Sequence, residues 1–357
     1  MFLHDCHDYK NCPREKKFTQ IKTIDPNVLK IGFVGCWGTY CQTGEQETFK
    51  VKVKKGNVEE KVTSNIYGSE YTVHLMKNFY RDKKADAIIL AGDNVYSKRP
   101  SDKNMKKYLE CKDEKCLKNL TYDIERQLDE GFEKCMAKVN TSRFLIGVGN
   151  HDMETCDILN YQLNYRRNHK WFMPGISYQY VYQMNGFKVN FVFINTNLYD
   201  NEHCSEMTQK DINSELDQQF EWMKHVLKER QHDSKKVWNV VVGHAPFLWN
   251  LHKAGQTLRT TFAEHMKSLK GDIDLYCCAD EHNQQYLKIK DYPTEIISGS
   301  GGAFLDDILS GDLKEYTVVG KKTFGFVDLE FTNLQIFVTF INKDKPETFT
   351  INCKIDL

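Results

Sequence analysis

Five short polar motifs carry the residues of this sequence that could bind metal ions. They are Gly35-Cys36-Trp37-Gly38, Gly92-Asp93-Asn94-Val95-Tyr96, Gly149-Asn150-His151-Asp152, Gly243-His244-Ala245-Pro246 and Ala279-Asp280-Glu281-His282-Asn283. Their carboxylate, imidazole, amide, phenol and thiol groups are the ligands that proteins offer to transition metals. A carboxylate can bridge two cations about 3.5–4 Å apart, and such a pair holds the attacking and leaving oxygens of an in-line displacement. The motifs therefore predict a two-metal hydrolytic site.

An apolar stretch typical of a β-strand precedes each motif. These stretches cover residues 30–35, 86–91, 143–148, 237–242 and 273–278, and a further one covers 188–196. Strands that are apolar throughout are typical of sheets covered on both faces, and such sheets bind ligands at the carboxyl ends of their strands. A single motif of this kind arises by chance, but several in this order, each after an apolar strand, indicate one shared site.

The rest of the chain predicts the layers around these strands. Apolar residues at helical spacing predict helices over 69–83 and 211–230. After residue 290, strands at 294–298, 324–331, 334–341 and 347–354 follow in quick succession, which predicts an antiparallel meander. Alternation followed by a meander favours two packed sheets with helices outside.

We interpret the chain as one domain with additions. Residues 1–27 form an N-terminal extension, and residues 28–357 form the domain. Two polar stretches are interpreted as insertions, near 44–66 and near 97–120. The first is predicted to be an exposed hairpin that turns around residues 55–57, and the second is rich in Lys, which is typical of a solvated face.

Charge and cysteine content limit the partners and the compartment. The 49 basic and 49 acidic residues cancel, so we expect no nucleic-acid partner and no general attraction to anionic membranes. Twelve cysteines without a Cys-x-x-Cys pair favour disulfides in an oxidising compartment over a zinc knuckle. No stretch has the ~18–20 apolar residues of a membrane span, and the N-terminus lacks the apolar core of a signal peptide. Either the protein is not secreted, or its signal peptide and any membrane anchor lie outside this chain. The cysteine content favours the second, and we expect the secretory pathway or the extracellular space.

The motifs resemble those of the purple acid phosphatases of the tartrate-resistant type, within the calcineurin-like metallophosphoesterase superfamily. The resemblance runs from about Lys30 to Ile341, and it includes the glycine-rich segment 297–302 and the helical segment 219–223. It implies an α/β fold, namely the four-layer αββα sandwich of two mixed β-sheets flanked by helices. It also implies hydrolysis of phosphomonoesters by two metal ions, iron plus zinc, manganese or a second iron.

The resemblance assigns ligands position by position. Asp93 would bridge the two metals, Tyr96 and His282 would bind the ferric ion, and Asn150 and His244 would bind the divalent ion.

Two histidines have possible catalytic roles by the same resemblance. His151 would face the substrate and assist the phosphate or the leaving group. His252 lies about two positions away from a further histidine of the family, and the alternative is a surface histidine without a catalytic role.

Two ligand positions depart from the family pattern. Cys36 replaces the Asp of a Gly-Asp-x-Gly loop, and Asp280 replaces the first His of a Gly-His-x-His motif. A thiolate suits zinc and other soft metals, whereas a carboxylate suits manganese, magnesium or iron. The alternatives are that Cys36 is a neutral buried thiol and that Asp280 is hydrogen-bonded elsewhere, and the sequence leaves both open.

These departures lead to three hypotheses about function. The first is phosphomonoester hydrolysis at a reduced or lost rate. The second is a catalytically inactive pseudophosphatase that acts as a scaffold or as the anchor of a membrane complex, as a relative of this fold does in apicomplexan parasites. The third is hydrolysis of phosphodiesters or nucleotides. The partner is accordingly a phosphomonoester substrate or a protein, and whether the chain is an enzyme stays open.

Overall fold

A computed structural model describes residues 18–24, 27–38, 46–55, 58–96, 124–199, 208–228, 235–247, 257–303, 305–308 and 317–352 of the chain. Their strands form two large mixed sheets and one separate hairpin. The eight-stranded sheet has the order β1 (Phe18–Thr23), β8 (Tyr178–Gln183), β9 (Phe187–Phe193), β10 (Lys236–Val242), β11 (Leu275–Cys278), β13 (Glu295–Ser298), β12 (Gln284–Leu287), β14 (Thr317–Lys321). The seven-stranded sheet has the order β17 (Glu347–Asn352), β16 (Gln335–Ile341), β15 (Phe326–Phe331), β2 (Leu29–Val34), β5 (Ala87–Ala91), β6 (Phe144–Gly147), β7 (Trp171–Phe172).

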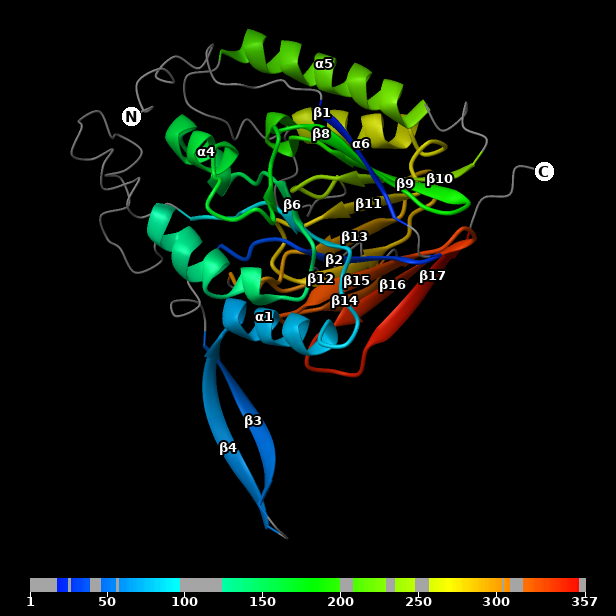
Figure 1. The fold of residues 1–357 in the computed structure, drawn as a ribbon. Helices are drawn as coiled ribbons and strands as arrows, with labels where there is room; N and C mark the ends of the chain where they lie inside the picture. Colours follow the sequence, from blue (N-terminus) through cyan, green and yellow to red (C-terminus); the bar gives the residue numbers. More distant parts are fainter. Residues whose placement is uncertain are drawn as a thin grey trace, which may run out of the picture.

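Helices lie outside the two sheets (Figure 1). The α-helices are α1 (Gly68–Phe79), α4 (Cys156–Leu163), α5 (Gln209–Lys228) and α6 (Thr257–Ser268). A π-helical turn, η2 (Leu128–Glu133), continues the α-helical residues 124–127, and there are 3-10 turns at η3 (Met136–Lys138), η4 (His151–Met153) and η5 (Thr196–Tyr199).

Three apolar cores separate the four layers. Side chains alternate along a strand, so Ile89 of β5 packs between the sheets while its neighbour Ile88 packs on the outer face. The outer face of the seven-stranded sheet also contacts Met76 of α1, and the outer face of the eight-stranded sheet contacts Leu216 of α5 and Met266 of α6. This double coverage explains why the central strands are apolar on both faces. The predicted αββα sandwich is confirmed.

Polar residues mark the starts of two helices. Thr155 precedes α4, and its side chain accepts a hydrogen bond from Ile158 N at 3.2 Å. Thr208 and Asp211 bond reciprocally at the start of α5, where each side chain accepts from the other's backbone N–H. Such caps satisfy backbone N–H groups that the first helical turn leaves without partners.

The residues predicted to form a hairpin do pair as one. Strands β3 (Gln46–Lys55) and β4 (Val58–Tyr67) pair antiparallel, with Lys55 opposite Val58. The hairpin projects away from the two sheets (Figure 1). The second predicted insertion, 97–120, lies outside the described residues.

Two strands differ from the sequence-based expectation. The predicted strand 294–298 does not join the C-terminal meander, because β13 lies between β11 and β12 and runs parallel to β11. This position buries Ile296 in the core between the sheets and Ile297 in the core under α5 and α6. Strand β1 falls in the stretch interpreted as an N-terminal extension, and it is the edge strand beside β8.

Candidate metal centre

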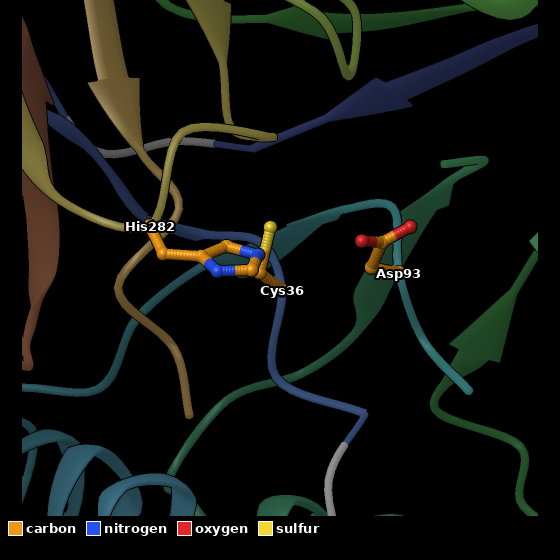
Figure 2. Close-up of side chains that lie close together, drawn as sticks. All are labelled: Cys36, Asp93 and His282. Carbon is orange, nitrogen blue, oxygen red and sulfur yellow. The ribbon is translucent and has the colours of Figure 1, made fainter. Parts of the chain in front are cut away.

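The predicted ligands come from loops at the carboxyl ends of five strands, three in one sheet and two in the other. Within the described residues, the Cys36 sulfur, a carboxylate oxygen of Asp93 and a ring nitrogen of His282 all lie within 4.8 Å of one another. Figure 2 shows these three side chains, which follow β2, β5 and β11. A backbone hydrogen bond from Gly35 N to Ser298 O at 2.8 Å joins the end of β2 in one sheet to the end of β13 in the other. The two sheets therefore meet at one site.

Three of the loops hold their candidate ligand in a left-handed backbone conformation. The φ angles are 55° at Cys36, 53° at Asp93 and 60° at Asp280. In the part of the chain that the structure describes, Asp291 is the one other non-glycine residue with positive φ. This conformation costs a non-glycine residue about 1–2 kcal/mol, and such strain concentrates at functional sites. Both replaced residues, Cys36 and Asp280, adopt it.

His244 presents one ring nitrogen to the site. Its Nδ1 lies 2.7 Å from the carbonyl oxygen of Ala91, which fixes the ring. Its Nε2 lies 3.3 Å from Asp93 Oδ1 and 3.6 Å from Asp280 Oδ1. A backbone carbonyl that orients the far side of an imidazole is the usual support of a metal-binding histidine.

Three buried polar atoms at the site have no hydrogen-bond partner among the described residues. They are the Tyr96 hydroxyl, Asn150 Oδ1 and His244 Nε2. Buried polar atoms are normally paired, so unpaired ones need a further explanation such as a bound ion. All three belong to predicted ligands, and an oxygen, amide and imidazole donor set suits a transition metal. The residues therefore fit the metal ions that the family implies.

The ionisable side chains of the site shift one another's pKa values. Burial lowers the pKa of His244, but Asp93 and Asp280 outweigh it and raise that pKa to about 10. Burial raises the pKa of Asp93, yet His244 and His151 bring it well below its usual value. Burial, together with Asp93 and Asp280, raises the pKa of the Cys36 thiol. A cation bound here would displace the protons of His244 and the Cys36 thiol, because metal ligands must be deprotonated.

His151 lies beside these groups and contacts Glu154 and Tyr96. Its Nδ1 is 2.6 Å from Glu154 Oε1, and its ring centroid is 4.4 Å from that of Tyr96. Burial lowers the pKa of His151, but Asp93 and Glu154 raise it to about 9. The side chain is 29% exposed, so a charged imidazole is accessible to an anionic ligand. The other histidine with a predicted catalytic role, His252, lies outside the described residues.

Asp152 is a supporting residue that the sequence did not reveal. Its buried carboxylate accepts hydrogen bonds from Gly149 N at 2.8 Å, Asn94 N at 2.9 Å and Asn94 Nδ2 at 3.0 Å. Val95 N and Gln162 Nε2 also donate to it, at 3.2 and 3.0 Å. Burial and then Asp93 raise the pKa of Asp152 to about 7. Asp152 thus joins the Asp93 loop to the Asn150 loop. In the sequence, its position next to His151 was the one feature that could have indicated this role.

Two further supports come from outside the motifs. Thr196 Oγ1 accepts hydrogen bonds from His244 N at 3.2 Å and from Ala245 N at 2.9 Å. Asp306 Oδ2 accepts from His282 N at 3.0 Å and lies 3.6 Å from His282 Nδ1. Neither residue belongs to a recognisable motif, so only the fold could show them.

Comparison with known proteins supports the family resemblance. A family model described as calcineurin-like phosphoesterase matches residues 29–284. Tartrate-resistant acid phosphatase type 5 from Oryctolagus cuniculus is 24% identical over 246 residues, which covers 63% of this chain and 73% of that protein.

Two solved structures share the fold. GAP50, the anchor in the inner membrane complex of Plasmodium, has a TM-score of 0.61 at 18% identity, with 92% of this chain and 90% of that chain covered. A dimetal phosphatase from Danio rerio has a TM-score of 0.51 at 11% identity, with 91% and 100% covered.

Proposed function

Because the chain belongs to the calcineurin-like phosphoesterase family, we propose that its metal centre binds phosphomonoesters across two cations and hydrolyses them at a reduced rate. The carrying observation is that Tyr96, Asn150 and His244 each bring a buried polar atom to the site without a satisfied hydrogen bond among the described residues, with His244 Nε2 held near the carboxylates of Asp93 and Asp280. Together with the cluster of Cys36, Asp93 and His282, they supply ligands to both sides of Asp93. When bound, the two ions supply positive charge against the phosphate oxygens and lower the pKa of water.

The side chains of this chain divide the work. Asp93 would be the shared ligand, with Cys36, Tyr96 and His282 to hold one ion and Asn150, His244 and Asp280 to hold the other. His151 is not a ligand, and its partly exposed imidazole beside Tyr96 would contact the phosphate or donate a proton to the leaving group. Glu154 keeps the His151 ring in place through the 2.6 Å contact at Nδ1.

The reduced rate follows from the two replaced residues. A thiolate donates more charge than a carboxylate, so a cation bound by Cys36 is a weaker Lewis acid. Asp280 lies close to Asp93 and His244 and adds negative charge where the family has a neutral imidazole. Both changes weaken the electrostatic stabilisation on which phosphoryl transfer depends.

The test is hydrolysis of p-nitrophenyl phosphate from acid to neutral pH by protein loaded with zinc, manganese or iron. We expect slow, metal-dependent turnover that Asp93→Asn abolishes. Equal hydrolysis rates for the unmodified protein and for Asp93→Asn with every metal tested would contradict the proposal. Bis-p-nitrophenyl phosphate, assayed in parallel, separates monoester from diester hydrolysis.

A catalytically inactive pseudophosphatase is the second candidate function. Both sides of Asp93 have lost a family ligand, and the fold is shared with a membrane-complex anchor. The β3–β4 hairpin, which projects away from the two sheets (Figure 1), offers a surface to a protein partner. This candidate predicts partner binding that survives Asp93→Asn and is lost when residues 46–67 are replaced by a short linker. Metal-dependent turnover above the Asp93→Asn background would reject the inactive state.

We also propose that the protein works in the secretory pathway or outside the cell. The support is the cysteine content, although Cys36, Cys277 and Cys278 are free thiols. Among the described residues, no helix has the length and apolar character to cross a bilayer. Disulfide mapping by mass spectrometry of unreduced protein tests the proposal, and twelve reduced cysteines in protein from its native source would contradict it.

A further inference from the structure

The two sides of Asp93 are not equivalent as metal sites. On the first side, the Cys36 sulfur, an Asp93 oxygen and a His282 nitrogen lie within 4.8 Å of one another. On the second side, His244 Nε2 lies 3.3 Å from Asp93 Oδ1 and 3.6 Å from Asp280 Oδ1, but in the described part of the chain these three residues do not all lie mutually close as the first three do. The first side is therefore the better preformed of the two.

The donor atoms of the first side suit one class of metal. Sulfur, nitrogen and oxygen in a compact set are typical ligands of zinc, which is usually tetrahedral in proteins. The buried Tyr96 hydroxyl, which has no hydrogen-bond partner among the described residues, is available as the fourth group. A soft thiolate favours zinc or cobalt over a ferric ion.

The backbone holds this donor set before any ion arrives. Cys36 is fully buried, and its loop is bonded through Cys36 N to Gly92 O and through Ala303 N to Cys36 O. Gly38 N donates to Asp93 O at 3.0 Å, so the loops of Cys36 and Asp93 are also joined directly. A preformed set of this kind binds with little loss of conformational freedom.

We propose that the Cys36 side binds one zinc-class divalent cation on its own, ahead of the second side, with the Cys36 sulfur as a ligand. The ion links the loops after β2 and β5 of the seven-stranded sheet to the loop after β11 of the eight-stranded sheet. It therefore stabilises the contact between the sheets whether or not the second position is filled. The inference uses the metal centre of the proposed function but does not require turnover.

The experiment is a titration of chelator-stripped protein with Co²⁺, followed by its thiolate-to-cobalt charge-transfer absorption in the near ultraviolet. We expect the band to saturate at one equivalent and to disappear when Zn²⁺ is added. Cys36→Ser should lose the band, and its zinc affinity should fall at least about tenfold. Cys277→Ala is the matched control, because Cys277 is also a fully buried free thiol but lies within β11.

A second variant covers the case in which Cys36→Ser fails to fold. Cys36→Asp restores an oxygen ligand, and Asp tolerates the left-handed backbone of this position. It should still bind cobalt but without the charge-transfer band. A wild-type protein without the band, or a band that persists in Cys36→Asp, would overturn the proposal. Phosphatase assays on the same samples keep the two proposals apart, because a band without turnover rejects only the catalytic one.

Discussion

The loops after β2 and β11 carry both replaced ligands, whereas the loops after β6 and β10 keep the family residues. Cys36 and Asp280 both have left-handed backbones, so the main chain sets the position of whatever side chain stands there. His244, in contrast, is held through its ring by Ala91 O and through its backbone by Thr196. Asp93 has a left-handed backbone as well and keeps the family residue, so the main chain positions both changed and unchanged ligands, whereas His244 depends on bonds to its ring. The predictions below test this difference, beginning with the largest effect.

Asp93→Asn should have the largest effect on metal affinity, because Asp93 faces both the loops with replaced ligands and the loops that keep the family residues. Asn tolerates the left-handed conformation and can still accept the hydrogen bond from His151 N, which is 3.2 Å from Asp93 Oδ1. We expect metal affinity to fall by roughly 100-fold at each side, since even a supporting residue of a metal site contributes about 10–100-fold. Calorimetric titration with zinc measures it. If Asp93→Asn binds metal as tightly as the wild type, Asp93 is not the shared ligand.

Asp152→Asn tests whether side-chain bonds hold the loop after β6. The substituted amide would place an NH₂ group against donors such as Gly149 N and Asn94 Nδ2. We expect a loss of about 2–5 kcal/mol in the free energy of unfolding, from about 1–3 kcal/mol for each unsatisfied buried group. Urea denaturation measures the loss. Asp157→Asn, on the half-buried start of α4, is the control and should change stability little.

Asp328→Asn tests a pH effect on stability that arises in the β-sheet and not at the metal centre. Asp328 of β15 accepts a 2.6 Å hydrogen bond from the Tyr80 hydroxyl, and burial raises its pKa to about 6. The fold therefore favours the protonated carboxyl. Its stabilising contribution is fully present below pH ~4, the unfolded value, and is lost as pH rises through about 6.

The size of this pH effect follows from the shift in pKa. A shift of about two units corresponds to about 3 kcal/mol of unfolding free energy, and Asp328→Asn should remove that dependence. Urea denaturation at a series of pH values measures it in chelator-treated protein. An unchanged pH dependence in the variant would assign the effect to another group.

The double variant Cys36→Asp, Asp280→His restores the family ligands in both changed loops. Asp and His are both tolerated in the left-handed region, so the backbone should accept them. We expect a second tightly bound ion and a phosphatase rate at least about tenfold higher, which corresponds to about 1.4 kcal/mol of transition-state stabilisation. Elemental analysis and p-nitrophenyl phosphate turnover are the measurements. No gain in either would mean that the site has changed beyond these two residues.

Much of the fold was predictable because burial on both faces makes a strand apolar throughout. Strands β2, β5, β6, β10 and β11 stand out for that reason. Strand β12 does not, because Gln284 and Gln285 are buried through hydrogen bonds rather than through apolar character. The position of β13 between β11 and β12 depends on tertiary pairing, which local pattern does not encode.

The candidate site was predictable as a set of residues but not as two unequal sides. Motif order after apolar strands indicated Asp93, Asn150 and His244 as one group. The left-handed backbone of Cys36 could not be predicted, because nothing in its local sequence requires positive φ. The hydrogen bonds of Asp152 could not be predicted either, because its partners belong to loops that come together only in the folded chain.

Anomalous X-ray diffraction from zinc-soaked crystals tests the central claim most directly. The predicted result is one strong zinc peak among the Cys36 sulfur, Asp93 and His282, with a weaker peak beside His244. A crystal without zinc density next to Cys36, or with the stronger peak beside His244, would contradict the account.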